Sequence, residues 1–272
     1  MRKELIAQKD PKSPIAEIFR TLRTNIQFMN SKNTLRTLLI TSTMPVEGKS
    51  WTSSNLAVTF AQAGKRVILV DCDMRKGRLH KIFQLNAVPG LSNYLSGIDE
   101  TGETGDNDIR KYIQRTEVDN LYLMTSGNVP PNPSELLASE KTSNMLESLK
   151  EAFDIVILDG TPCLLVTDSI ILSRIADSTI IVTAHKITKK DSLEKVKKSI
   201  ENVGGKIAGV VLNKVPTNIQ KYKSTYYYSS SDRTSARDNF NLDNIQKPDD
   251  LTKEKTDEIL QHLDEYLNNN KQ

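Results

Sequence analysis

Apolar and polar residues recur along the chain with two different periods. Six apolar runs have the length of buried strands, and the stretches between several of them have the 3.6-residue period of amphipathic helices. The expected strands span 37–41, 66–73, 120–127, 153–160, 177–184 and 207–214, and the expected helices lie around 49–63, 133–150, 168–175 and 189–203. This order predicts an α/β fold, a mostly parallel sheet with helices on both faces. Right-handed crossovers then bring the carboxyl ends of the parallel strands to one edge, where such sheets bind ligands.

A further helix is predicted before the first strand, over residues 14–29. Ser13 is the expected N-cap and Pro14 the first helical residue. Glu17, Arg20 and Arg23 are expected to point away from the core, because they fall opposite the apolar stripe. That stripe consists of Ile15, Ile18, Phe19, Leu22, Ile26 and Met29.

Composition limits the possible functions. The chain has 272 residues, enough for one large α/β domain with appendages, and its net charge of +3 gives no reason to expect nucleic acid as a partner. No apolar run reaches the roughly 20 residues of a membrane span, and the first residues lack the apolar segment of a secretory signal, so we expect a cytoplasmic protein. Two cysteines and three histidines, widely spaced, favour neither a disulfide framework nor a zinc site.

Two polar segments interrupt or follow the alternating pattern. An acidic, glycine-containing loop covers 99–108, and we expect the main domain to end near residue 215. Residues 216–230 are predicted to be a flexible tail that carries the cluster Tyr222, Tyr226, Tyr227 and Tyr228. Residues 231–272 form a polar extension with a possible short amphipathic helix, in which Ile259, Leu260, Leu263 and Leu267 share a face.

The stretch LLITSTMPVEGKSWTSSNLA, residues 38–57, reads as a strand, a phosphate-binding loop and a helix. Gly48, Lys49 and Ser50 match the end of G-x-x-x-x-G-K-[ST], although Thr43 stands where that pattern has its first glycine. In such a loop backbone amides and the helix N-terminus bind phosphates, the lysine contacts the β and γ phosphates, and the hydroxyl binds Mg²⁺. G-K-S alone is a weak signal, so its position between a strand and a helix carries the prediction.

Carboxylates at the ends of two other strands strengthen this prediction. Asp71 and Asp73 close the run VILVDCD and lie on one side of an extended segment, since their spacing is two. Asp159 ends the run DIVILD, where a P-loop enzyme places a carboxylate that organises Mg²⁺. Each has a second interpretation as a solvated strand end, but three at one sheet edge favour a nucleotide site.

In this order of motifs the chain resembles the bacterial tyrosine kinases of capsule and exopolysaccharide operons. The resemblance covers residues 13 to about 228 and rests on E-x-x-R-x-x-R, TSTMPVEGKS, ILVDCDMRKG, SGNVPPNPSELLAS, the Asp159 strand, GVVLNK and the tyrosine cluster. It implies a P-loop fold of the deviant-Walker ATPase type, with ATP and Mg²⁺ as substrate and cofactor. It also implies regulation of polysaccharide synthesis and export through phosphorylation of the chain's own tyrosines.

The resemblance assigns roles at the nucleotide site. It implies that Lys49 holds the transferred phosphate, that Glu47, Gly48 and Ser50 belong to the nucleotide-binding loop, and that Ser50 binds Mg²⁺ directly. Arg75 is implied as a further charge-stabilising group.

The same resemblance divides the carboxylates. It makes Asp71 the leading candidate for the base that orients or deprotonates the attacking tyrosine. Asp73 and Asp159 would hold the water shell of the metal. Asn213 falls where related ATPases read the adenine edge, and a simple strand-ending asparagine is the other interpretation.

The resemblance also implies partners. Glu17, Arg20 and Arg23 match a subunit-contact motif, which implies a homo-oligomeric ring in which one subunit's tyrosine tail enters the next subunit's site. The activator is expected to be the cytoplasmic tail of a membrane-spanning polysaccharide regulator, which would hold the chain at the inner face of the membrane. A cognate tyrosine phosphatase is expected as well, and a solvated helix face remains the second interpretation of the three charged residues.

Three residues depart from the family pattern. Val46 replaces a glycine, and a β-branched residue disfavours positive φ, so either the backbone is ordinary there or the loop is altered. Trp51 replaces a small hydroxyl residue and would either pack on the sheet or crowd the site. Gly160 follows Asp159, and we expect it to loosen the turn beside the metal.

Three other functions were weighed against the kinase. A chromosome- or septum-positioning ATPase shares the sheet and the aspartates but carries a lysine where this chain has Met44. A non-enzymatic nucleotide-binding scaffold of the same export system is supported only by Val46, Trp51 and Gly160. A dinucleotide oxidoreductase is excluded, because no G-x-G-x-x-G follows the first strand.

Overall fold

The computed structural model describes residues 4–29, 35–98 and 108–216. It divides the chain into two compact units, Met1–Thr225 and Tyr226–Gln272, and all of the second unit lies outside the described residues. The predicted tyrosine tail from residue 217, the polar extension and nearly all of the acidic loop therefore also lie outside them. The following description concerns the first unit.

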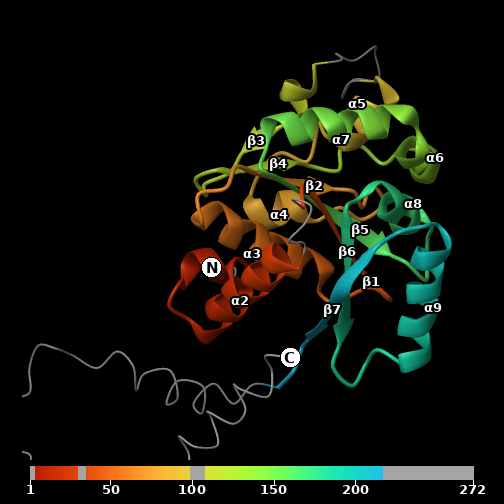
Figure 1. Ribbon diagram of the computed structural model, residues 1–272. Coiled ribbons are helices and arrows are strands. Elements are labelled where there is room, and N and C mark those ends of the chain that lie inside the picture. Colours follow the sequence, from red (N-terminus) through yellow and green to blue (C-terminus); the bar gives the residue numbers. More distant parts are fainter. Residues whose placement is uncertain (1–3, 30–34, 99–107, 217–272) are drawn as a thin grey trace, which may run out of the picture. The chain divides into compact units, whose positions relative to one another are not determined.

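Seven strands form one sheet in the order β3-β4-β2-β5-β1-β6-β7 (Figure 1). All neighbours are parallel except β3 and β4, which confirms the predicted mostly parallel sheet. The six predicted strands are present with ends shifted by a few residues, and the two-residue β3 was not predicted. The strands are β1 (Thr37–Ser42), β2 (Val67–Asp71), β3 (Gln114–Arg115), β4 (Leu121–Met124), β5 (Ile155–Pro162), β6 (Ser178–Ala184) and β7 (Ile207–Asn213).

Apolar side chains alternate along the strands and form a core on each face of the sheet. On β1, Leu38 and Ile40 pack on the face that carries α3, whereas Leu39 packs on the opposite face. The first face is covered by α1 (Ile6–Lys9), α2 (Pro14–Phe28), α3 (Lys49–Gln62) and α4 (Leu79–Phe83). The second face is covered by α5 (Leu91–Ser96), α6 (Pro133–Ala138), α7 (Glu140–Ala152), α8 (Asp168–Ile175) and α9 (Lys190–Asn202), with the 3₁₀ helix η1 (Ile109–Tyr112). Figure 1 shows the two groups of helices on either side of the sheet.

The N-terminal helix forms as its caps predict. The Ser13 hydroxyl accepts a hydrogen bond from the Ala16 amide at 3.2 Å, and Pro14 is the first helical residue. Phe19 and Ile26 are buried as expected, but Ile18 and Met29 are 46% and 54% exposed, so the predicted stripe is too wide at these two positions. The buried face is narrower because α2 packs mainly on one helix, α3.

The elements that the sequence did not predict are short. The predicted helix over 133–150 is two helices, because Ser139 adopts an extended backbone between α6 and α7. Helices α1, α4 and α5 contain four to six residues each, too few for a helical period to be recognised. None of the helices in the described ranges has the length and apolar character needed to cross a bilayer.

Gly160 lies inside β5 and does not loosen a turn, so that expectation was wrong. A Cβ atom there would lie 2.3 Å from the Ser169 hydroxyl oxygen and 3.0 Å from a methyl carbon of Leu39. The Ser169 hydroxyl accepts from the Thr161 amide at 2.7 Å and donates to the Thr161 carbonyl at 2.8 Å, which fixes it against the strand. Glycine is therefore required here for the close approach of α8 to β5 and not for flexibility.

We expect Gly160→Ala to lower the free energy of unfolding by about 2–3 kcal/mol, since the new methyl group overpacks a site whose neighbour cannot move away. Gly209→Ala is the matched control, because Gly209 also lies in a strand and a Cβ atom there would meet nothing within 4 Å. Chemical denaturation of the two variants tests this difference. Equal stability of the two variants would contradict the proposed packing of Ser169.

Candidate active site

The phosphate loop joins β1 to α3 at the carboxyl edge of the sheet. Gly48 has φ = +103°, and a Cβ atom there would lie 2.0 Å from the Asn213 side-chain nitrogen. That nitrogen donates to the Glu47 carbonyl at 2.9 Å, so the end of β7 holds the loop. Only glycine satisfies both the backbone angle and the contact.

The carboxylate of Glu47 organises the loop from within. It is 2% exposed and accepts hydrogen bonds from the Thr43 amide at 2.7 Å, the Thr43 hydroxyl at 2.7 Å and the Met44 amide at 2.9 Å. The Thr188 hydroxyl donates to the same carboxylate from the loop after β6. Glu47 therefore lies in the phosphate loop with its side chain pointing into the protein, and its predicted part in nucleotide binding stays a prediction.

Val46 has φ = +66°, a left-handed conformation that glycine adopts far more easily than valine. Its side chain is 82% exposed, so no packing in the described residues compensates for the backbone strain. The loop thus holds Val46 in a left-handed backbone, so the first alternative considered from the sequence, an ordinary backbone at this position, is wrong.

Lys49 lies among three aspartates that come from β2 and β5. Its Nζ is 3.1 Å from an Asp73 oxygen and 3.9 Å from an Asp159 oxygen. Asp71 and Asp159 are directly paired in the register of β2 with β5. Asp71 and Asp159 lie on the α3 face of the sheet, because they continue the alternation of the strand residues packed on that face, and Asp73 follows the end of β2.

Burial dominates the electrostatics of this cluster. Burial raises the pKa of Asp71 to about 7, with a further contribution from the negative charge of Asp159. Burial also raises the pKa of Asp159, although the Lys49 ammonium acts in the opposite direction. For Lys49, burial lowers the pKa, but the neighbouring carboxylates Asp159, Asp73 and Asp71 outweigh it and the net pKa is raised. The lysine therefore remains charged, and Asp71 titrates near neutral pH.

The oxygen atoms present suit Mg²⁺. Both carboxylate oxygens of Asp159 are buried without a hydrogen-bond partner, and the hydroxyl of Ser50 lies 3.3 Å from Lys49 Nζ. Mg²⁺ prefers such hard oxygen ligands and usually keeps several waters or phosphate oxygens.

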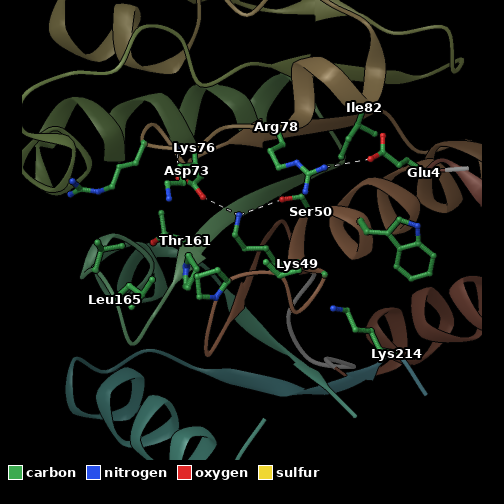
Figure 2. Close-up of a pocket in the computed structure, with 17 residues that line it drawn as sticks. Glu4, Lys49, Ser50, Asp73, Lys76, Arg78, Ile82, Thr161, Leu165 and Lys214 are labelled. Atoms are coloured by element: carbon green, nitrogen blue, oxygen red, sulfur yellow. Dashed lines mark hydrogen bonds and ion pairs between the residues drawn. The ribbon is translucent and has the colours of Figure 1, made fainter. Parts of the chain in front are cut away.

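A cavity of about 580 Å³ opens beside the loop (Figure 2). Asp73 lines it, whereas Asp71 is 0% exposed and accepts hydrogen bonds from the amides of Leu79 at 3.0 Å and Asp73 at 3.3 Å. The cavity is lined by Glu4, Pro45, Val46, Gly48, Lys49, Ser50, Trp51, Asp73, Arg75, Lys76, Arg78, Ile82, Thr161, Pro162, Leu165, Val166 and Lys214.

Trp51 packs between the cavity and α2. Its ring meets Phe19 edge to face with 5.0 Å between ring centroids, and the side chain is partly buried against the core on the α3 face. The indole therefore packs on a helix and not on the sheet as one alternative had it, and it also lines the cavity, while its effect on a bound ligand stays a prediction.

Sequence reasoning missed the residues that hold Arg75. The carboxylate of Asp168, which is 0% exposed, pairs with the Arg75 guanidinium at 3.2 Å. The Ser134 hydroxyl donates to the same carboxylate at 2.6 Å. Asp168 precedes a helical stretch in the sequence, which signals a helix N-terminus but does not identify a partner 93 residues away.

Proteins of similar sequence indicate the family of the chain. A family model described as an AAA domain matches residues 46–211. The putative tyrosine-protein kinase CapB of Staphylococcus aureus is 40% identical over 228 residues, which are 84% of this chain and 96% of that protein. The tyrosine-protein kinase YwqD of Bacillus subtilis (strain 168) is 35% identical over 232 residues, 85% of this chain and 94% of that protein. The chain belongs to the bacterial tyrosine kinase family.

Solved structures agree with this family. The crystal structure of the chimerical protein CapA2B2 matches with a TM-score of 0.73 and 39% identity, over 80% of this chain and 92% of that chain. The septum site-determining protein MinD from Pyrococcus horikoshii, in complex with Mg-ADP, matches with a TM-score of 0.56 and 24% identity, over 68% of this chain and 72% of that chain. The MinD likeness shows the fold alone, and with the family it confirms the predicted P-loop fold class.

In this kinase one of the three charged residues of α2 differs from its predicted orientation. Glu17 and Arg20 form an ion pair at 2.6 Å, and Arg20 also donates to the Pro11 carbonyl. Arg23 donates to the Thr59 carbonyl of α3 at 2.8 Å, so it contacts the body of the domain and does not point away from it. The expectation was wrong for Arg23 because its long side chain reaches back over the neighbouring helix. The predicted ring contact stays a prediction.

The roles predicted for the remaining site residues also stay predictions. The start of α3 and the carboxyl ends of β2 and β5 bring five of these residues together: Lys49, Ser50, Asp71, Asp73 and Asp159. Asn213 lies against the phosphate loop. Its side-chain oxygen accepts a hydrogen bond from the backbone amide of the next residue, Lys214, at 2.8 Å. Tyr222, Tyr226, Tyr227 and Tyr228 lie outside the described residues.

We expect Val46→Gly to stabilise the protein by about 1 kcal/mol, because relief of the left-handed strain exceeds the entropy that glycine gains in the unfolded chain. Val210→Gly is the matched control, since Val210 is also an exposed valine, 49% exposed, but has an ordinary strand backbone. That substitution should destabilise the protein by about 0.5–1 kcal/mol. Urea denaturation compares them, and a shift in the same direction for both variants would refute the strain at Val46.

Proposed function

We propose that this chain is an ATP- and Mg²⁺-dependent protein-tyrosine kinase that phosphorylates the tyrosine cluster of a neighbouring copy. The observation that carries the proposal is the arrangement of Lys49 at the phosphate loop, 3.1 Å from Asp73 and 3.9 Å from Asp159. Membership of the tyrosine kinase family and the tyrosine cluster at 222–228 support it.

The residues of the site divide the work of phosphoryl transfer. Lys49 and the loop amides hold the phosphates, and Arg75, fixed by Asp168, adds positive charge at the cavity wall. Ser50, Asp73 and Asp159 would hold Mg²⁺, which neutralises charge on the phosphates when bound. Most of the rate in such reactions comes from positioning and charge neutralisation, so this rigid set of groups fits the task.

The base for the acceptor hydroxyl is assigned to Asp71, as the family resemblance implies. Its pKa near 7 matches a group that accepts a proton at neutral pH. Because Asp71 is 0% exposed, a tyrosine hydroxyl can reach its carboxylate only if binding of the acceptor or nucleotide exposes it.

Partners and location are part of the proposal. We assign the activator to the cytoplasmic tail of a membrane-spanning polysaccharide regulator, and reversal to a cognate tyrosine phosphatase. The kinase would then lie at the inner face of the membrane and regulate capsular or exopolysaccharide synthesis and export. The likeness to the chimerical protein CapA2B2 and to CapB supports this setting.

A nucleotide-binding scaffold of the same system is the second candidate. The observation that favours it is Val46, a β-branched residue held in a left-handed backbone within the phosphate loop, where the family pattern has glycine.

The kinase test compares the purified chain with Lys49→Met, in ATP and Mg²⁺, with and without the regulator's cytoplasmic tail. We expect phosphate at the tyrosine cluster to fall by at least about 100-fold in the variant, because the site loses its phosphate-binding cation. Lys65→Met, at an exposed turn after α3, is the matched control and should retain activity.

A mixing experiment shows whether transfer occurs between copies. Lys49→Met chains keep their tyrosines, and chains with Tyr222, Tyr226, Tyr227 and Tyr228 changed to phenylalanine keep their active site. Phosphate on the Lys49→Met chains in the mixture is the expected result, as read by mass spectrometry. Nucleotide bound by the unaltered chain without any tyrosine phosphorylation would instead support the scaffold.

We also expect Glu17, Arg20 and Arg23 changed together to alanine to disperse a ring into smaller species, because an interface that uses charged hydrogen bonds loses its donors. Light scattering measures the change in mass. Since Arg23 also contacts the Thr59 carbonyl, circular dichroism must show that α2 remains folded. An unchanged mass would remove these residues from the interface.

A further inference from the structure

Positive charge at the cavity exceeds what the phosphate loop supplies. Five lysine and arginine side chains line it, against two carboxylates: the cations are Lys49, Arg75, Lys76, Arg78 and Lys214, and the acids are Glu4 and Asp73. Lys49 is already paired with aspartates, and Arg75 is paired with Asp168. A strongly anionic ligand such as a triphosphate therefore needs further cations from the wall.

Arg78 is the cation whose position is best defined among those that remain. Its guanidinium makes one ion pair among the described residues, with the Glu4 carboxylate at 3.5 Å, and its side chain is 63% exposed. Figure 2 shows this pair on the cavity wall opposite Lys214. One exposed ion pair is weak, so most of the five guanidinium N–H donors stay available to a ligand in the cavity.

The backbone that carries Arg78 is fixed by the site itself. The Lys76 amide donates to Asp73 at 2.9 Å, and the Leu79 amide donates to Asp71 at 3.0 Å. A Cβ atom on Gly77 would lie 2.2 Å from the Ser126 hydroxyl oxygen, so the turn also packs closely on β4's end. The two carboxylates thus hold the segment on both sides of Arg78.

Glu4 is held just as firmly from the other side. Asn55 of α3, 0% exposed, donates to the Glu4 carbonyl at 2.8 Å and accepts from the Ala7 amide at 3.0 Å. Gln62 donates to the Ala7 carbonyl at 3.0 Å. The helix that begins at the phosphate loop therefore fixes the N-terminal segment, and with it the partner that places Arg78 on the wall.

Strand order shows which end of a nucleotide Arg78 would face. Arg78 follows β2, whereas Lys214 follows β7, and β5, β1 and β6 separate those two strands. The β2 flank carries Asp73, whose carboxylate lies 3.1 Å from Nζ of Lys49, the group that would contact the β and γ phosphates. Arg78 is therefore on the flank of the terminal phosphoryl group.

We propose that Arg78 is a substrate-binding residue that contacts the terminal phosphoryl group of a bound nucleoside triphosphate. This rests on the proposed function, because that phosphoryl group is the one transferred. The guanidinium exchanges its Glu4 contact for phosphate oxygens, with which it forms charge-assisted, bidentate hydrogen bonds.

The test is calorimetric binding of two ligands with Mg²⁺: ADP, and an ATP analogue with nitrogen in place of the β–γ bridging oxygen. We expect Arg78→Ala to weaken binding of the analogue by about tenfold, as for loss of a charged hydrogen bond, and binding of ADP by less than about twofold. Arg78→Lys should fall between, because it keeps the charge without the bidentate geometry.

Arg66→Ala is the matched control. Arg66 lies before β2 at the opposite edge of the sheet, is 59% exposed and also makes one weak ion pair, with Asp154 at 3.8 Å. The Arg66→Ala variant should bind both ligands with the affinity of the unaltered chain. Thermal unfolding of each variant confirms that the fold is kept.

The outcomes separate this inference from the proposed function. Unchanged affinity for the analogue in Arg78→Ala, or an equal loss for ADP and the analogue, overturns the assignment to the terminal phosphoryl group. A selective loss for the analogue upholds it even where the unaltered chain transfers no phosphate to tyrosine, a result that defeats only the proposed kinase activity.

Discussion

The balance between Lys49 and three buried aspartates is the constraint on which the rest of the site depends. A buried carboxylate without a partner is costly, and the protein brings three to one point where parallel strands end. The ammonium group of Lys49 offsets part of that charge, and burial raises the pKa of Asp71 to about 7. A divalent cation would neutralise the remaining negative charge, so the fold itself favours the ligands of phosphoryl transfer.

The loop above these carboxylates is held in place by hydrogen bonds from side chains. Glu47 accepts from two amides of the loop and from hydroxyls on two segments, and Asn213 fixes the following turn. These bonds account for a valine in the left-handed region at Val46, because a network of buried hydrogen bonds determines the backbone around it. The backbone conformation of the loop therefore depends on hydrogen bonds from Thr188 and Asn213 as well as on its own residues.

The sequence predicted the sheet, its main helices and the joining of Lys49 with three aspartates, because strand periodicity and the common carboxyl edge are properties of short segments. It did not predict what depends on long side chains or distant segments. Arg23 folds back onto α3, Asp168 holds Arg75 across 93 residues, and Gly160 fits under a serine of α8. The tyrosine cluster that is proposed as phosphoacceptor was found from the sequence and the family resemblance, and it lies outside the described residues.

The packing of Trp51 has a practical consequence for work in solution. It is the single tryptophan of the chain, and it touches both the cavity wall and Phe19 on α2. Its ultraviolet emission consequently arises from one place, where the ligand pocket and the N-terminal helix meet. The natural protein thus carries a built-in optical probe, and its fluorescence reports events at either surface without any attached label.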